Sequence, residues 1–271
     1  ARVARLGLVS VPHVAVVTGA GQGIGAAIAE RLAAAGAFVF ATGRRREPCA
    51  ALVERLRARG QRGEALALDV TDRESIRAAL EVVLRMSDEL GPPDWLVNNA
   101  GIAKSAPLLH PGEVTDPYEE HLAVNFHGAR RMVEALLPGM RARGYGRIVN
   151  VASSAGLVGY AYVSAYCASK HALVGYTRAA ALELAGSGVA IGAVCPHYVD
   201  SPMTERSAAR IAEKTGRTSE EARALLAAQN PGKRLVTPAE VAEAVHEQLA
   251  GEHNGAIVEL DGRAGPRGRG G

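Results

Sequence analysis

The fold expected of this chain is decided by the stretch Val14-Ala15-Val16-Val17-Thr18-Gly19-Ala20-Gly21-Gln22-Gly23-Ile24-Gly25. Its β-branched start predicts a short strand, and an Ala-rich segment of helical period follows the glycines at once. Glycines at such a turn permit a tight bend and a close approach of the backbone to a ligand. The helix N-terminus adds unpaired N–H groups and the positive end of a dipole. The stretch therefore predicts a pyrophosphate site, although many strand-to-helix turns need glycine for structural reasons alone.

The same alternation of short β-branched runs and longer Ala-, Leu-, Arg- and Glu-rich stretches continues along the chain. It is typical of repeated βα units around a parallel sheet. The expected strands are residues 14–17, 38–41, 65–68, 95–98, 147–151, 190–194 and 256–259. The expected helices are residues 24–35, 50–59, 75–89, 118–143, 165–185 and 238–249. We therefore predict one α/β domain over residues 1–271, a Rossmann-like, doubly wound parallel seven-stranded sheet with helices on both faces.

Residues 200–235 depart from this alternation. An additional helical segment separates the sixth strand from the last helix, which is far more than a typical connection needs, so we expect a helical lid over a substrate. Its seven basic and five acidic residues fit a solvated helix face, and attraction of an anionic substrate is the alternative. The Gly- and Arg-rich residues 262–271 are expected to form a flexible, solvated tail.

The composition argues against several classes of protein. Hydrophobic residues make up 48% of the chain and charged residues 22%, so neither disorder nor a membrane protein is indicated. No apolar stretch is long enough to span a bilayer, and residues 1–10 do not resemble a cleaved leader, so we expect a cytoplasmic protein. The three cysteines are too few and too widely spaced for a zinc site or a disulfide framework, and no metal is expected. A formal charge of +3 does not imply a nucleic-acid partner.

The end of the second expected strand bears on the choice of cofactor. It reads Phe40-Ala41-Thr42-Gly43-Arg44-Arg45-Arg46, with glycine where an NAD-selective protein usually has an acid for the ribose hydroxyls. Arg44 can instead pair with the 2′-phosphate of NADP. A basic helix start that faces water is the alternative, but the helix dipole disfavours cations there. We therefore expect NADP(H) to be favoured over NAD(H).

A tyrosine and a lysine lie four residues apart in Tyr166-Cys167-Ala168-Ser169-Lys170, at the start of an expected helix. This spacing puts both side chains on one helix face. An ammonium about 5 Å from the phenol would lower the tyrosine pKa from about 10 toward physiological pH, where general acid/base catalysis is efficient. Such pairs are otherwise ordinary amphipathic surface pairs.

Ser153 follows the fifth expected strand, at the sheet edge where open α/β sheets bind ligands. Its hydroxyl can hold a substrate oxygen beside Tyr166. Serine in this place is otherwise an ordinary turn or cap residue, and Ser154 is the rival for the same role.

Together these segments resemble the short-chain dehydrogenase/reductase family, over about residues 14–262. The resemblance is carried by Thr18 to Gly25, Asn98-Asn99-Ala100-Gly101, Asn125, Ser153, and Tyr166 through Lys170. The segments Gly146-Arg147-Ile148-Val149-Asn150-Val151-Ala152-Ser153 and Ala193-Val194-Cys195-Pro196 look most like ketoreductases that act on 3-oxoacyl thioesters and polyketides. The resemblance implies a small-molecule ketone or secondary alcohol as substrate, and a homotetramer built on the two long helices.

The resemblance also implies roles for individual residues. Tyr166 would be the acid/base, Lys170 would hold the nicotinamide ribose and lower the tyrosine pKa, Ser153 would orient the carbonyl, and Asn125 would anchor a water in a proton relay. The cofactor would be bound by Gly19, Gln22, Gly23, Ile24, Gly25, Arg44, Asp69, Val70, Asn98, Ala100, Gly101, Tyr166, Lys170, Pro196, Val199 and Ser201.

Two departures from the family pattern leave questions open. Pro196-His197 stands where Pro-Gly is usual, so the imidazole faces either the pocket or solvent. Asp261-Gly262-Arg263 follows the last strand where another glycine is common, which bears on the terminus or a subunit contact. The sequence is compatible with three functions. They are an NADP(H)-dependent carbonyl reductase, an NAD-dependent dehydrogenase that works in the oxidative direction, and a non-catalytic cofactor-sensing or nucleic-acid-binding protein on a reused fold.

Overall fold

The computed structural model describes residues 13–109, 116–263 and 267–269. The expectations for residues 1–10 and for the remainder of the tail lie outside these residues. One sheet has the strand order β3-β2-β1-β4-β5-β6-β7-β8. Its strands are β1 (Val14–Thr18), β2 (Phe38–Gly43), β3 (Gly63–Ala67), β4 (Trp95–Asn98), β5 (Gly146–Val151), β6 (Val189–Pro196), β7 (Ile257–Leu260) and β8 (Arg267–Arg269). All pairs from β3 to β7 are parallel, and β8 lies antiparallel to β7.

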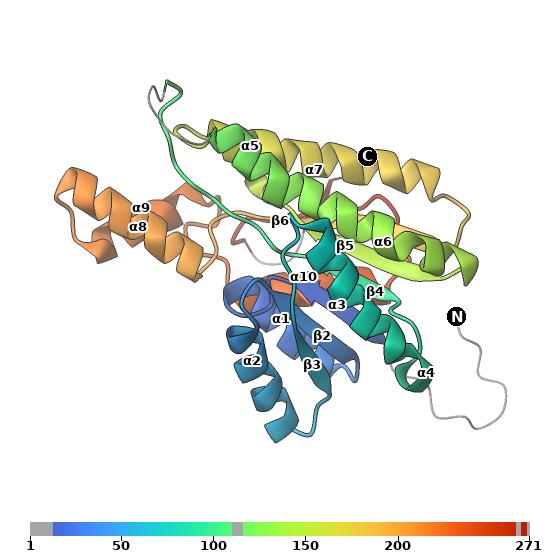
Figure 1. Ribbon diagram of the computed structural model, residues 1–271. Helices are drawn as coiled ribbons and strands as arrows, with labels where there is room; N and C mark the ends of the chain where they lie inside the picture. Colours follow the sequence, from blue (N-terminus) through green and yellow to red (C-terminus); the bar gives the residue numbers. More distant parts are fainter. Residues whose placement is uncertain (1–12, 110–115, 264–266, 270–271) are drawn as a thin grey trace.

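Ten α-helices are described around this sheet (Figure 1). They are α1 (Gly23–Ala34), α2 (Arg46–Ala58), α3 (Arg73–Arg85), α4 (Ser87–Leu90), α5 (Pro117–Leu122), α6 (Ala129–Ala142), α7 (Ser164–Glu183), α8 (Pro202–Thr215), α9 (Ser219–Gln229) and α10 (Pro238–Ala250). A π-helical segment, Ala123–Gly128, joins α5 to α6, and a 3₁₀ turn, Ser154–Gly156, precedes α7.

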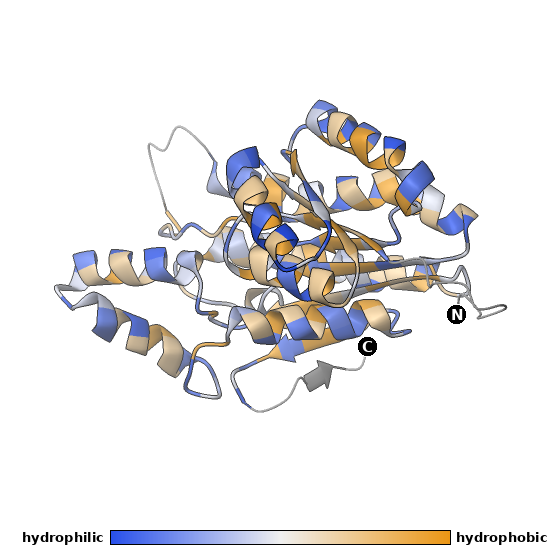
Figure 2. Ribbon diagram, turned by 90° about the horizontal axis from the view of Figure 1, so that it is seen from below, coloured by the Kyte–Doolittle hydropathy of each residue, from blue (hydrophilic) through white to orange (hydrophobic). Residues whose placement is uncertain are grey.

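The alternation of side chains along the strands builds two cores. In β1, Ala15 and Val17 pack with α1, α2 and α10, whereas Val14 and Val16 pack with α3, α6 and α7 on the opposite face. Figure 2 shows the central strands as predominantly hydrophobic, with hydrophilic residues gathered on the outward sides of the helices. The predicted doubly wound sheet is therefore confirmed, and its seven parallel strands are those expected from the sequence.

The position of the ligand crevice follows from the strand order. After β3 the chain crosses to the other side of β1, so the connections that leave β1 and β4 diverge and open a crevice at the carboxyl edge of the sheet. Thr18 ties the end of β1 to the segment that follows β4, because its Oγ1 accepts hydrogen bonds from the N–H groups of Asn99 (3.0 Å) and Ala100 (3.1 Å).

Several elements differ from the sequence-based expectation. The helix expected over residues 118–143 contains the π-helical segment, and the helix over 75–89 divides into α3 and α4. The lid contains two helices, α8 and α9, packed through Ala208, Ala222 and Leu226, and it extends from one side of the body (Figure 1). Part of the expected tail, Arg267–Arg269, forms β8, because β7 offers it an unpaired edge. Within the described residues, no helix has the length and apolar character needed to cross a membrane.

Candidate active site

A cavity of about 1140 Å³ runs along the carboxyl edge of the sheet, from the β1–α1 turn to the lid. Fifteen of the predicted cofactor residues line it: Gly19, Gln22, Gly23, Ile24, Gly25, Arg44, Asp69, Val70, Ala100, Gly101, Tyr166, Lys170, Pro196, Val199 and Ser201. Ser153 lines it as well. The fold thus brings segments from most of the chain to one continuous space, large enough for an extended ligand and a second molecule beside it.

The glycine turn at one end of this cavity fits a pyrophosphate. Gly19 has a φ of +66°, and a Cβ at Gly25 would lie 2.2 Å from the Gly19 carbonyl oxygen, so neither position tolerates a side chain. The N-cap of α1, Gln22, makes no side-chain capping bond, and the first turn holds no acid. Its N–H groups and the dipole are therefore left for an anionic ligand, as the sequence predicts.

The three arginines after β2 have different surroundings. Arg46 donates to the Ala65 carbonyl oxygen (3.0 Å) and pairs with Glu64 (3.4 Å), and Arg45 is exposed outside the cavity. Arg44 lines the cavity and has no hydrogen bond or ion pair with any residue that the structure describes. Of the three, Arg44 is therefore the guanidinium available to a phosphate on a bound nucleotide.

Two neighbouring asparagines at the end of β4 have different surroundings. Asn98 is buried and does not line the cavity, because its Nδ2 donates to Asn150 Oδ1 (2.9 Å) and to the Ala129 carbonyl oxygen (3.3 Å). Asn99 lines the cavity instead. Its Nδ2 donates to the carbonyl oxygens of Thr18 (3.0 Å) and Gly19 (3.1 Å), so it holds the glycine turn in shape. The resemblance assigned Asn98 to the cofactor, whereas Asn99 of the same Asn98-Asn99-Ala100-Gly101 motif is the asparagine that lines the cavity.

Asp69 and Val70, which follow β3, form another part of the cavity wall. The Oδ1 atom of Asp69 accepts hydrogen bonds from Thr71 N (2.9 Å) and Thr71 Oγ1 (2.7 Å). Its other carboxylate oxygen is not used in either of these bonds. The aspartate therefore fixes its own turn and still presents an acceptor at the edge of the cavity.

Tyr166 and Lys170 lie one turn apart in α7, where the cavity meets the ends of β5 and β6. Lys170 is only 4% exposed, its Nζ donates to the Val151 carbonyl oxygen (2.8 Å), and it lies 5.8 Å from the centre of the Tyr166 ring. A hydrogen bond joins Tyr166 to Ser153. Ser154 is already engaged, because its Oγ accepts from the Tyr160 hydroxyl (2.9 Å). Of the two rival serines, Ser153 is therefore the one paired with the phenol.

Burial controls the protonation of this pair. It raises the pKa of Tyr166 to about 12, against the opposing effect of the Ser153 hydrogen bond, and it lowers the pKa of Lys170 to about 8. The prediction of a lowered tyrosine pKa is therefore wrong for this structure, because desolvation of the phenol dominates. Both groups are moved toward their neutral forms, so the phenol holds its proton throughout the physiological range.

Asn125 lies beneath the cavity floor, in the π-helical segment. Its Nδ2 donates to the Ile102 carbonyl oxygen (3.0 Å) and to Ser169 Oγ (2.9 Å), and its Oδ1 accepts from Ile102 N (2.8 Å). A Cβ at Gly101 would lie 3.2 Å from this Oδ1 and 3.7 Å from Lys170 Nζ. The bare backbone at Gly101 therefore keeps a small gap between the asparagine and the lysine, where the sequence reasoning expected a water.

His121 is a buried neighbour of the tyrosine that the sequence reasoning overlooked. Its Nδ1 donates to the Pro117 carbonyl oxygen (2.6 Å), its Nε2 accepts from Lys104 N (3.0 Å), and its ring meets the Tyr166 ring edge-on at 6.2 Å. A backbone N–H can only donate and a carbonyl can only accept, so these partners fix the neutral tautomer. A lone histidine in an expected helix carries no sequence signal for such a role.

His197 does not turn toward solvent, which was one of its two expected orientations. Its side chain is 9% exposed, and its Nε2 lies 2.8 Å from Glu259 Oε1. It also belongs to the cavity wall, together with Tyr160 and Tyr198, which the sequence did not single out.

On the lid, the spacing of Arg206, Arg210 and Lys214 along one face of α8 could have indicated that they share the same cavity.

The family model for short chain dehydrogenases matches residues 13–212. The chain belongs to this family. The 3-oxoacyl-[acyl-carrier-protein] reductase FabG of Vibrio harveyi is 38% identical over 232 residues, which cover 86% of this chain and 87% of the relative. The D-beta-hydroxybutyrate dehydrogenase of Cupriavidus necator is 37% identical over 255 residues, which cover 92% of this chain and 96% of the relative. This short-chain dehydrogenase is thus an oxidoreductase with a cofactor of the NAD(P) type.

Solved structures agree with this assignment. A crystal structure of an actinorhodin polyketide ketoreductase variant with NADPH superimposes with a TM-score of 0.84 at 35% sequence identity. The match covers 93% of this chain and 96% of that one. The resemblance to the family predicted from the sequence is therefore confirmed, by the family model over residues 13–212 and by the structural match over 93% of the chain.

Proposed function

We propose that this short-chain dehydrogenase is an NADPH-dependent ketoreductase, which reduces the ketone of a 3-oxoacyl thioester or polyketide-like substrate to a secondary alcohol. The observation that carries the proposal is the placement of Tyr166, Ser153 and Lys170 at one end of a cavity whose other end is formed by the glycine turn and the uncapped α1 N-terminus. A proton donor and a nucleotide site in one space suit carbonyl reduction.

Each residue of the site would have its own role in the reaction. The Ser153 hydroxyl and the Tyr166 phenol hold the ketone oxygen, and Tyr166 donates its proton as negative charge develops there. Bound NADPH supplies the hydride. Lys170 and Tyr166 would hold the nicotinamide ribose, and the α1 N-terminus would hold the pyrophosphate. Lys170 has a pKa of about 8, so it can lend positive charge near the phenol or pass on a proton.

The protonation state of Tyr166 fits the proposed reduction. A phenol with a pKa of about 12 is protonated at neutral pH, as a proton donor must be, whereas oxidation of an alcohol needs the phenolate as base. The NAD-dependent dehydrogenase alternative takes its support from relatives named as dehydrogenases, such as the Cupriavidus necator protein. It needs a tyrosine pKa that binding of the cofactor has lowered by several units.

The preference for NADPH rests on Arg44 and Gly43. Arg44 is unpaired within the described chain and lines the cavity, and Gly43 leaves no carboxylate to repel a 2′-phosphate. Two solved relatives carry this type of cofactor: the actinorhodin ketoreductase has NADPH, and an NAD(P)-dependent gluconate 5-dehydrogenase from Beutenbergia cavernae has NADP.

The lid supports an anionic substrate. Arg206, Arg210 and Lys214 line the cavity from α8, and none has an acidic partner among the residues that the structure describes. Arg223 on α9, by contrast, is paired with Asp200 and Glu205. Acyl groups carried on phosphate-bearing thioesters, as in the name of the Vibrio harveyi relative, have the charge that this cationic face attracts.

The long helices α6 and α7 are the proposed faces of a homotetramer. Leu182 near the C-terminal end of α7 is 81% exposed, so the helix offers a large apolar side chain to such a contact. Light scattering on the purified protein tests this proposal, and a stable monomer at micromolar concentration contradicts it.

The proposed reaction is tested by mixing the purified protein with NADPH and acetoacetyl-coenzyme A and following the loss of NADPH absorbance. We expect turnover with NADPH, slower turnover with NADH, and little activity in Tyr166→Phe. A panel of cyclic and aryl ketones extends the substrate range. Tight NADPH binding without reduction of any ketone or 3-oxoacyl thioester would contradict the proposal, as would tighter binding of NADH than of NADPH.

A further inference from the structure

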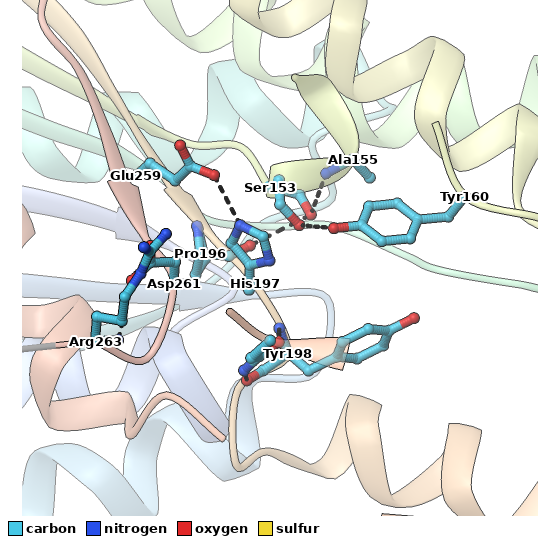
Figure 3. Close-up of polar contacts among 11 residues, drawn as sticks. Ser153, Ala155, Tyr160, Pro196, His197, Tyr198, Glu259, Asp261 and Arg263 are labelled. Carbon is cyan, nitrogen blue, oxygen red and sulfur yellow. Dashed lines mark hydrogen bonds and ion pairs between the residues drawn. The ribbon is translucent and has the colours of Figure 1, made fainter. Parts of the chain in front are cut away.

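His197, in the wall of the substrate end of the cavity, forms a largely buried polar pair with Glu259 (Figure 3). Glu259 lies in β7, between Cys195 of β6 and Arg267 of β8 in the sheet register. His197 directly follows β6, and its backbone N–H donates to the Leu260 carbonyl oxygen (2.9 Å). Both ends of the pair are therefore anchored to the rigid sheet rather than to the lid.

The contact with Glu259 decides which ring nitrogen carries the proton. A carboxylate only accepts hydrogen bonds, so Nε2 of His197 carries hydrogen and donates across the 2.8 Å contact. In the neutral ring the other nitrogen, Nδ1, is then an acceptor. It is buried, and no described residue donates to it.

The unpaired nitrogen faces an aromatic frame. Figure 3 shows it on the side of the ring away from Glu259, toward the space between Tyr160 and Tyr198. The two tyrosine rings meet edge-on, with centroids 6.2 Å apart. The Tyr160 hydroxyl is tied to Ser154 Oγ, and Asn230 holds both the N–H (3.0 Å) and the carbonyl oxygen (2.9 Å) of Tyr198. The frame is thus fixed on both sides before any ligand arrives.

This frame is adjacent to the reacting centre. Ser153, the partner of the Tyr166 phenol, lies 3.5 Å from the Pro196 carbonyl oxygen through its Oγ, and Pro196 immediately precedes His197. Whatever part of a substrate flanks its ketone on the Pro196 side would therefore meet the two tyrosine rings and the His197 nitrogen. A flat ring suits the aromatic walls, and a hydroxyl on that ring can donate to the nitrogen.

We infer that His197 Nδ1 is a specificity-determining acceptor, which selects ketones whose flanking ring carries a hydroxyl group. This inference rests on the proposed ketone site and deepens it: among polyketide-like substrates, the site favours cyclic or aromatic ketones that carry a hydroxyl group. An unpaired buried acceptor penalises ligands without a donor and rewards those that have one. Glu259 acts through His197, as a positioning residue that holds the acceptor tautomer.

The experiment measures the binding of paired ligands to the protein saturated with NADP⁺, so that no turnover is required. The probes are 1-tetralone, its 5-, 6- and 7-hydroxy derivatives, and the corresponding methoxy ketones, which keep the ring and the oxygen but cannot donate. We expect at least one hydroxytetralone to bind about tenfold more tightly than its methoxy counterpart, as one added hydrogen bond allows. Equal affinities throughout, or no binding of any hydroxytetralone, would overturn the inference.

Matched variants assign the effect to the nitrogen. His197→Leu removes the acceptor and should abolish the preference for hydroxyl over methoxy, whereas His197→Asn, which can place an oxygen near the same position, should retain part of it. Glu259→Gln should weaken the preference, because an amide no longer fixes the tautomer. A preference that survives in His197→Leu would overturn the inference. So would a loss of NADP⁺ affinity in that variant with all ketones affected alike, because the nitrogen would then serve the cofactor.

A second measurement keeps the test independent of folding and of the proposed reaction. Nitrogen-15 NMR of the histidine rings should show an unprotonated Nδ1 at His197, whose resonance shifts when the preferred hydroxytetralone binds. Failure of the protein to reduce ketones would contradict the proposed function and leave both binding results standing. A protonated Nδ1 in the NADP⁺ complex would overturn the inference about His197 alone.

Discussion

The two ends of the cavity are built in different ways. The cofactor end consists mostly of backbone: a glycine at φ +66°, an uncapped helix N-terminus and the turn that Asn99 holds. The substrate end consists of side chains from distant elements, such as Tyr160, His197 and Arg210. Backbone sites require particular residue types at fixed spacings, whereas side-chain sites require only that the fold brings them together. The first kind can therefore be recognised in a sequence, and the second emerges only in three dimensions.

The largest expected effect lies at the junction of the two ends. Tyr166→Phe keeps the ring and removes the transferable proton, so kcat should fall by about 10³-fold while NADPH affinity stays within about twofold. Steady-state rates and a fluorescence titration of NADPH check both halves of this prediction. Tyr145→Phe, the same change on a ring that does not line the cavity, is the control and should leave kcat unchanged. Near-normal turnover in Tyr166→Phe would remove the tyrosine from the mechanism.

Lys170 should oppose folding even though it serves catalysis. Its pKa of about 8 in the fold lies below the ordinary 10.5. Between these pH values the unfolded chain therefore binds more protons than the folded chain, and the contribution of Lys170 to the free energy of unfolding rises with pH. Lys170→Met removes this dependence.

The difference in unfolding free energy between the variant and the wild type should therefore change by about 2 kcal/mol in favour of the wild type from pH 8 to pH 10.5. Urea unfolding of the cofactor-free proteins at several pH values measures it. The variant should also lose cofactor affinity and turnover. A difference that does not change with pH would show that the ammonium is not desolvated.

Arg44→Asp tests whether the cofactor end owes its selectivity to one side chain. Reversing the charge should weaken binding of the 2′-phosphate. The ratio of kcat/KM with NADPH to kcat/KM with NADH should therefore fall by at least about tenfold. Arg45→Asp is the matched control, because Arg45 is exposed and lies outside the cavity. An equal shift in both variants would mean that only the general field of the surface matters.

The smallest effect is expected at the lid. The double variant Arg206→Gln with Lys214→Gln should lower kcat/KM for acetoacetyl-coenzyme A about threefold to tenfold and flatten its dependence on salt. An uncharged ketone should be unaffected. Arg217→Gln serves as the control, because Arg217 belongs to the same lid and does not line the cavity. If all three proteins respond alike to salt, the cationic face of α8 is only a solvated surface.

The sequence predicted the sheet, the glycine turn and the spacing of Tyr166 and Lys170, because each depends on local periodicity or on a required glycine. It could not predict the direction of the tyrosine pKa shift, since that depends on how deeply α7 is buried against β5 and β6. It named Arg44 rather than Arg46 for the cofactor, but it could not show that Arg46 is already engaged, since Glu64 lies on a neighbouring strand. His197 was noticed only as a departure, and its partner Glu259 lies 62 residues away.

The short strand β8 has a consequence for how the protein can be handled. By pairing antiparallel to β7, it covers a row of N–H and C=O groups that would otherwise be open to another chain. Glu259 belongs to that row, in register with Arg267. Trimming the chain after Gly262, or fusing a bulky tag there, would leave the backbone N–H and C=O groups of β7 unpaired. It would also loosen the strand that carries Glu259. Self-association and an altered choice of ketone would then arise from a single cut that removes no residue of the cavity wall.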